Sequence, residues 1–180
     1  MDLSSPTDAF MAAAADPSRW GAAMDALAQA TGSFGATILP LGGRSPLSQA
    51  PVSASMEELA SEYIRGNWRE RDGLDAYRSQ IMREGVAANP DFERSRWYQE
   101  HLRPCGVRWS ASAKVGQETV ALGLYRTTEQ GPFTPEEIGK LRDLSLALGG
   151  VVELARAFEF RRIDAKLSAF ERSQSPVATD

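Results

Sequence analysis

The stretch GVRWSASAKVGQETVALGLYR, residues 106–126, carries the clearest β pattern in the chain. Its first half places alternate apolar residues on one face of a strand, and these are Val107, Trp109, Ala111, Ala113 and Val115. Its second half does the same with Val120, Leu122 and Leu124. The Gly-Gln-Glu segment at 116–118 is typical of a hairpin turn. We therefore expect strands at 106–116 and 118–126 to be antiparallel neighbours.

The sequence before this hairpin predicts helices, strands and then a further helix. Apolar residues recur at helical spacing in DPSRWGAAMDALAQATG (16–32) and again over 56–69. A shorter helix is expected at 4–15. SFGATILPLGG (33–43) reads as a strand, and 45–53 as a weaker second strand because of its prolines. Residues 69–85 predict a turn and a short helix or loop, and 85–92 a brief strand.

The segments that flank the hairpin carry helix signals. The helix expected over 93–106 must end before Pro104, because proline disfavours helical backbone in the preceding residue. A long helix is expected over 131–174. Thr134 can cap it, Pro135 suits its first position, and Glu137 closes a capping box with Thr134. The Gly149-Gly150 pair inside this helix would let another backbone approach closely.

This order of elements predicts an α+β fold, in which an antiparallel sheet carries helices on one face and a long exit helix follows. The length of 180 residues suits one domain, which we place at 1–160 with a helical extension at 161–180. A net charge of −4 gives no electrostatic footprint for nucleic acid. No leader peptide and no membrane span is expected, and we predict a cytoplasmic protein.

The only histidine and the only cysteine, His101 and Cys105, stand four residues apart. Pro104 separates them, and a zinc site needs three or four protein ligands, so we predict no metal site. Nothing marks an orienting residue or an oxyanion hole for a Cys–His nucleophile. Phosphate-loop, dinucleotide and nucleophile-elbow motifs are also missing from the sequence. We expect no enzyme and no cofactor, with Cys105 as a small buried side chain.

Three stretches support a family resemblance: DPSRWGAAMDALAQATG (16–32), WYQEHLRPCGVRWSASAKVG (97–116) and ALGLYRTTEQGPFTPEEIGKLRDLSLALGGVVELARAF (121–158). The order of elements resembles a GAF-like, PAS-related sensory domain. The three stretches resemble more closely the N-terminal region of bacterial LuxR-type helix-turn-helix regulators. The connection from strand to leucine-rich helix, R-x-x-x-Q-G-P-F-T-P-E-E (126–137), is the most specific part. Residues 44–92 match only loosely.

The resemblance implies a signal-input and dimerisation domain, whose DNA-binding domain would lie on sequence beyond these 180 residues. Aromatic side chains in the middle of the chain could enclose a small-molecule pocket. The predicted pocket residues are Tyr63, Trp68, Tyr77, Trp97, Tyr98, His101, Trp109 and Tyr125. The flanking Arg103 and Arg108 could meet an anionic ligand. The same aromatics also describe an ordinary core, and the alternative is a ligand-free interaction module with a filled core.

The long helix predicts a parallel homodimer. Apolar residues recur in it at alternating spacings of three and four, which is a heptad-like seam. A helix of this length outruns a small domain and usually needs a partner chain. The predicted interface residues are Leu144, Leu148, Val151, Ala155 and Phe158.

Overall fold

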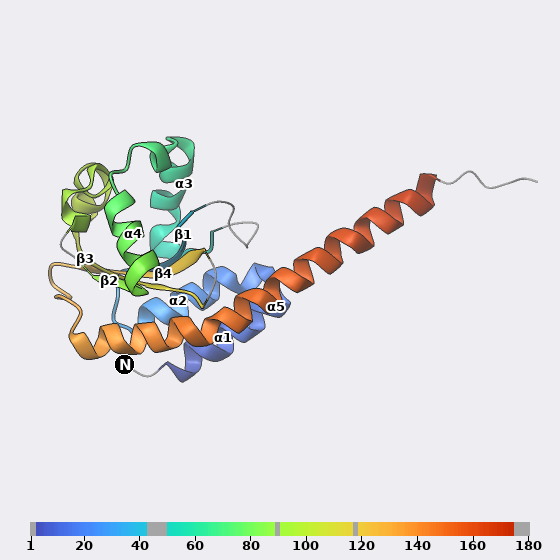
Figure 1. Cartoon of the computed structure of the whole chain (residues 1–180), viewed down its shortest axis with the longest axis horizontal. Helices are drawn as coiled ribbons and strands as arrows, with labels where there is room; N and C mark the ends of the chain where they lie inside the picture. The colour runs from blue at the N-terminus through green and yellow to red at the C-terminus, as the bar shows by residue number, and fades with distance from the viewer. Residues whose placement is uncertain (1–2, 43–49, 89–90, 117–118, 175–180) are drawn as a thin grey trace, which may run out of the picture.

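The computed structural model describes residues 3–42, 50–88, 91–116 and 119–174 (Figure 1). Its helices are α1 (Ser4–Ala15), α2 (Trp20–Ala30), α3 (Glu57–Arg65), α4 (Asp75–Glu84) and α5 (Pro135–Gln174). Its strands are β1 (Gly35–Pro40), β2 (Val86–Ala88), β3 (Val107–Lys114) and β4 (Val120–Thr127). This mixture of helices with an antiparallel sheet confirms the α+β class.

The sheet is antiparallel throughout, with strand order β1-β4-β3-β2. The 106–126 stretch forms its two central strands, as its alternation predicted. The register shifts between Val107 and Trp109, where β3 bulges against β4. A bulge reverses the side-chain alternation, so Val107 lies on the opposite face of the sheet from Ala111 and Ala113. The expectation that Val107 shares their face is therefore wrong.

Helices cover both faces of the sheet, so the expected one-sided arrangement is wrong. Figure 1 shows α1, α2 and α5 against one face and α3 and α4 against the other. Buried apolar residues divide in the same way. The α5 core includes Phe10, Met24, Leu27, Leu122 and Leu141. The α4 core includes Tyr77, Ile81, Phe92, Leu102 and Tyr125. The alternation of residues in the sequence does not show that both faces of the sheet are covered. In the structure β4 is buried at nearly every position, on both faces.

The apolar seam of α5 packs mainly inside its own subunit. Leu144, Leu148, Val151 and Ala155 are all buried in the α5 core, and Phe158 is half-buried. The helix needs this face to cover α1 and the sheet, which removes most of the predicted interface from any partner chain. Leu146 and Leu154 of the same helix are instead 58% and 40% exposed.

The start of α5 has the expected capping box. The Thr134 backbone N–H donates to Glu137 Oε2 at 2.9 Å, and the Glu137 N–H donates to Thr134 Oγ1 at 3.2 Å. Glu137 also binds Arg126 of β4, with 2.7 Å from Arg126 Nη2 to Glu137 Oε1. Arg126 Nη2 donates further to the Thr31 carbonyl at the end of α2, at 2.5 Å. One buried guanidinium therefore joins α2, β4 and α5.

The glycine pair in α5 allows the expected close approach of another backbone. A Cβ atom added to Gly149 would lie 2.9 Å from the Gly116 Cα at the end of the hairpin. Gly150 faces open space. The Gly116 N–H donates to the Ser145 carbonyl at 3.2 Å. Gly149 thus seats the hairpin end directly on the helix.

Two segments differ in detail from their expected form. The helix expected over 93–106 is irregular: a π-helical turn, Tyr98–Leu102, is followed by a 3-10 turn, Arg103–Cys105, that contains Pro104. Most of the weak strand expected at 45–53 lies outside the described residues. Its end does lie beside β1, because the Ile38 N–H donates to the Pro51 carbonyl at 2.8 Å.

Candidate functional site

An apolar cavity of about 190 Å³ lies in the α4 core, between β1 and helices α3 and α4. Aliphatic side chains form most of its wall, including Leu39, Val52, Met56, Leu59 and Ile81. At ~30 Å³ per molecule in liquid water, this volume corresponds to about six water molecules. Cavities lined almost wholly by apolar groups hold water poorly and accept apolar guests.

The structure divides the predicted pocket residues into two groups. Tyr63, Tyr77, Trp97 and Tyr125 line the cavity. Trp68, Tyr98, His101 and Trp109 do not belong to its lining. Trp68 and Tyr98 are buried in the α4 core beside the cavity wall. Trp109 is partly exposed and lies under the Arg108 guanidinium at 5.1 Å.

His101 lies in an aromatic stack that supports the cavity wall. Its ring stacks on Trp97 at 4.3 Å between centroids and meets Trp68 edge-on at 4.5 Å. Trp97 in turn contacts Tyr63 in a T-shaped pair at 4.9 Å. The π-helical turn that starts at Tyr98 places His101 one turn beyond Trp97. His101 thus reaches the cavity only through Trp97.

Polar groups on the sheet side of the cavity come from neighbouring strands. Thr37 of β1 and Ser112 of β3 lie on either side of Gly123 of β4 in the sheet register. The Tyr77 hydroxyl bonds Ser112 Oγ at 3.1 Å and Ser110 Oγ at 3.3 Å. Burial raises the pKa of the Tyr77 and Tyr125 phenols, so both remain neutral hydroxyls. The sheet side of the cavity therefore offers hydroxyl groups and no charge.

A buried ion pair closes the side of the cavity near α4. Asp72 is 1% exposed, and its carboxylate accepts hydrogen bonds from Arg78, from the Tyr63 hydroxyl and from the Leu74 N–H at 2.8 Å. The Arg78 guanidinium also donates to the Tyr63 hydroxyl oxygen at 2.9 Å. Burial alone would raise the pKa of Asp72, but the Arg78 and Tyr63 hydrogen bonds outweigh it and lower that pKa.

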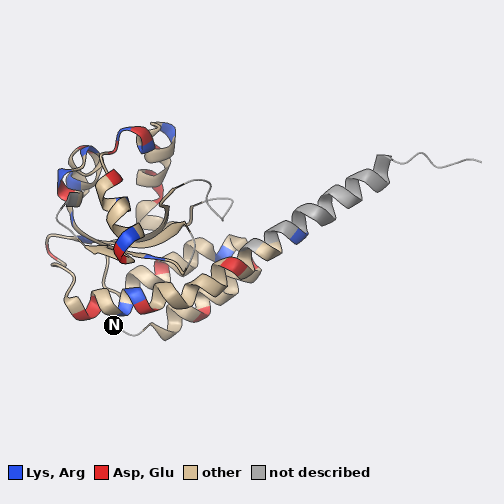
Figure 2. Cartoon of the chain, viewed as in Figure 1, with Lys and Arg blue, Asp and Glu red and all other residues tan. Residues whose placement is uncertain are grey.

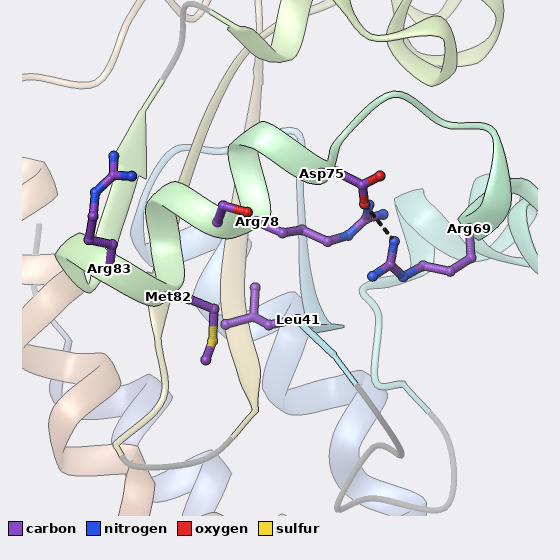
Figure 3. Close-up of a pocket in the computed structure, with 7 residues that line it drawn as sticks. Leu41, Arg69, Asp75, Arg78, Met82 and Arg83 are labelled. Atoms are coloured by element: carbon purple, nitrogen blue, oxygen red, sulfur yellow. Dashed lines mark hydrogen bonds and ion pairs between the residues drawn. The ribbon is translucent and has the colours of Figure 1, made fainter.

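A wider, open pocket lies on the outer side of Arg78. Figure 3 shows Arg69, Arg78 and Arg83 around it with Asp75, Met82 and Leu41. Its volume is about 550 Å³. Asp75 binds Arg69 at 3.2 Å and Arg78 at 3.3 Å, yet its side chain is 87% exposed. Leu41 and Arg78 line both this pocket and the inner cavity, so the two spaces meet there.

The structure places Cys105 at the surface and the His101 ring in the aromatic stack. Cys105 is exposed, which corrects the expectation of a buried thiol. Among the described residues, no group of three His, Cys, Asp or Glu side chains could hold a metal ion. Arg103 pairs with Gln99 at 2.9 Å and Arg108 lies 3.8 Å from Glu93, and neither arginine lines the cavity.

Within the part of the chain that the structure describes, no helix is long and apolar enough to cross a membrane.

Sequence reasoning missed Thr37, Asp72 and Arg78. Asp72 precedes a glycine and reads as a turn residue, and Arg78 lies in a helix whose apolar pattern is weak. Thr37 occupies an alternate position in a strand that looks apolar on its other face. Of these three residues, only Thr37 could have been noticed from the sequence. It is a hydroxyl residue among the buried residues of the strand predicted over 33–43.

The chain was compared with protein-family models, curated proteins and solved structures, and none of them matches it. The cavity, the ion pair and α5 are therefore the features that bear on its function.

Proposed function

We propose that this chain is a signal-input and dimerisation domain that senses a small molecule in the α4-core cavity. The observation that carries the proposal is the cavity itself, since the aliphatic and aromatic side chains that line it leave its space unfilled. A close-packed core has few voids larger than a water molecule. The resemblance to GAF-like domains of LuxR-type transcriptional regulators suggests the biological setting.

The alternative is a ligand-free interaction module with a filled core. In favour of that alternative, Trp68 and Trp97 contact each other at 5.3 Å and His101 completes their stack. However, that stack lies to one side, and the space between Tyr63, Tyr125 and Ile81 is open. The cavity therefore favours ligand sensing over the filled module.

A path from the cavity to α5 runs through β4. Tyr125 lines the cavity, and its neighbour Arg126 holds Glu137 in the first turn of α5. Successive residues of a strand point to opposite faces of the sheet, so this pair connects the α4 side to the α5 side. A ligand that binds more tightly to one position of β4 than to another would raise the population of that position, and α5 would move with β4. The change in population is set by the difference between the two affinities.

Dimerisation through α5 remains part of the proposal, on a different face of the helix. A helix of 40 residues is about 60 Å long at ~1.5 Å per residue, and Figure 1 shows its C-terminal part leaving the body. Figure 2 shows few charges on α1 and along the middle of α5. Leu146 and Leu154 of α5 are exposed, and Met11 of α1 is 50% exposed. We assign these side chains to the contact with the second copy.

We assign no catalytic reaction to this domain and no direct contact with DNA. A DNA-binding role would belong to a separate domain that the dimer positions, in the cytoplasm. The chain has a net charge of −4, which does not suit contacts with nucleic-acid phosphates.

A thermal-shift screen of the full chain against a library of small apolar molecules tests sensing. Compounds that bind the cavity should raise the melting temperature in proportion to affinity and concentration. The variant Ala60→Phe should lose the response, because Ala60 lines the cavity and a phenyl ring would fill it. Ser61→Phe, at an exposed position of α3, should keep it. A flat response to every compound would favour the filled-core module.

A further inference from the structure

One hydroxyl at the cavity lacks the partner that burial normally requires. Thr37 is 3% exposed and lines the cavity, yet within the described chain its Oγ1 has no hydrogen-bond partner. The Tyr125 phenol lies close enough to interact with Thr37, but outside hydrogen-bond geometry. Buried hydroxyls without partners are uncommon and destabilise the fold. The hydroxyl is thus placed to bind something that enters the cavity.

The sheet register leaves this hydroxyl without a side chain opposite it in β4. Gly123 lies opposite Thr37 in β1 and opposite Ser112 in β3. A Cβ atom at position 123 would lie 3.1 Å from Thr37 Oγ1 and 3.3 Å from Ser112 Oγ. Because glycine has no side chain, position 123 places no group over the Thr37 hydroxyl. The neighbouring Ser112 hydroxyl is already bonded to Tyr77 at 3.1 Å.

Charge around the cavity argues against an ionic ligand. The cation that lines it, Arg78, is bonded to the Asp72 carboxylate, and that pair is buried. The other polar side chains among the lining residues are uncharged, namely the phenols of Tyr63, Tyr77 and Tyr125 and the indole of Trp97. A carboxylate or ammonium placed against the sheet would lose its water without gaining a free counter-charge.

We propose that the cavity binds a short, neutral, mainly apolar molecule whose single carbonyl or ether oxygen accepts a hydrogen bond from Thr37 Oγ1. This inference rests on the proposed sensing function and adds the chemical class of the ligand. The volume of about 190 Å³ limits the buried part to a small chain or ring. The Thr37 hydroxyl favours a ligand with an acceptor oxygen, and the aliphatic wall favours an apolar remainder of the molecule.

Matched probes separate the contribution of Thr37 from simple burial. The probes are 2-heptanone, its hydrocarbon isostere 2-methyl-1-heptene, and heptanoate, each titrated into the full chain by calorimetry. The variant Thr37→Val keeps the side-chain shape and removes the hydroxyl. The ketone-to-alkene affinity ratio should fall about five- to tenfold in this variant, which is the usual worth of one hydrogen bond. Comparing the two ratios cancels the dehydration of each probe.

Thr31→Val is the control variant. Thr31 is also buried, at 4% exposure, but its hydroxyl donates to the Leu27 carbonyl at 2.8 Å. Without ligand, Thr37→Val should raise the melting temperature because it removes an unpaired polar group, whereas Thr31→Val should lower it. Thr31→Val should leave the ketone-to-alkene ratio unchanged.

Several outcomes would overturn the inference. An equal ratio in wild type and Thr37→Val would show that the hydroxyl does not choose the ligand. Tighter binding of heptanoate than of 2-heptanone would show an anion site instead. If the alkene and ketone both fail while other library compounds bind, the ligand class is wrong but sensing stands. If no compound binds at all, both the ligand class and the sensing function fail.

Discussion

At the scale of single residues, Asp72 and Arg78 form the most consequential pair in the molecule. The Asp72 carboxylate is almost fully buried, and its other partners are Tyr63 and the Leu74 N–H. Buried pairs stabilise little in total, but removal of one partner leaves the other charge without compensation. The pair therefore fixes the turn at 72–74 and the near side of the cavity.

The variant Asp72→Ala should lower the free energy of unfolding by about 3–5 kcal/mol, because Arg78 would lose its buried counter-charge and keep only the exposed carboxylate of Asp75. Asp75→Ala is the matched control, since Asp75 binds the same arginine at 3.3 Å but is 87% exposed. Its effect should stay within about 1 kcal/mol. Urea denaturation of both variants measures the difference, and equal losses would contradict the role of burial.

The pH dependence of stability gives a second test of Asp72. Its pKa is lowered in the folded state, so the pair stabilises the protein above the unfolded pKa of ~3.9 and loses this contribution as the pH falls. Wild type and Asp72→Ala should therefore converge in stability at acidic pH. A constant difference between pH 7 and pH 2 in urea midpoints would show that Asp72 acts only by packing.

At the scale of elements, the start of α5 depends on Glu137. The Arg126 hydrogen bond holds the pKa of this carboxyl at about 2, below its usual 4.5. The lowered pKa means that Glu137 stabilises the fold above about pH 4.5 and loses this effect as the pH falls through about 2.

Glu137→Gln should lower stability at pH 7 by about 1–3 kcal/mol, the usual range for hydrogen bonds to charged groups. The difference from wild type should shrink between pH 4.5 and pH 2. Glu136→Gln is the control, because Glu136 is 78% exposed and binds only the surface residue Lys140 among the described ion pairs. If both variants respond alike, the Arg126 contact does not anchor α5.

The contact between α5 and the hairpin gives a further prediction. Gly149→Ala should destabilise the protein by about 1–3 kcal/mol, because the new Cβ would press on the Gly116 backbone. Gly139→Ala, in the same helix but facing open space, should instead stabilise it by up to about 1 kcal/mol. Thermal melting of the two variants distinguishes them by sign. A gain in both would show that the hairpin end can move away freely.

The elements themselves could largely be predicted from the sequence. Alternation in 106–126 indicates the central strands, and Thr134, Pro135 and Glu137 mark the start of α5, because these signals are local. The layers could not be predicted, since an apolar stripe shows that a face is covered but not by what. Leu144 and Leu148 read as a dimer seam for this reason, although they cover the chain's own core. Half of the predicted pocket residues line the cavity. The role of Thr37 could not be predicted, because it depends on Gly123, which lies opposite it on the neighbouring strand.

At the scale of the whole molecule, the dimer prediction now concerns the outer face of α5. The double variant Leu146→Glu/Leu154→Glu should be monomeric, whereas wild type should sediment as a dimer at tens of micromolar. These side chains are 58% and 40% exposed, so circular dichroism should show an intact fold. A wild-type particle of about 20 kDa at that concentration would contradict dimerisation of this chain.

Val151→Glu provides the contrast to that double variant. Val151 is 7% exposed in the α5 core, so a buried carboxylate there should unfold the subunit rather than simply separate two copies. If Val151→Glu folds and becomes monomeric, the seam that contains Leu144, Leu148, Val151 and Ala155 would be the interface.

The central claim is that the α4 core contains a cavity open to a guest molecule. A crystal of the full chain under xenon pressure tests it most directly, since xenon occupies empty apolar cavities whatever the natural ligand is. We predict a xenon peak between Tyr63, Ile81 and Tyr125 in wild type, and its loss in Ala60→Phe. Wild-type crystals in which side chains fill that space and no xenon binds there would contradict the account.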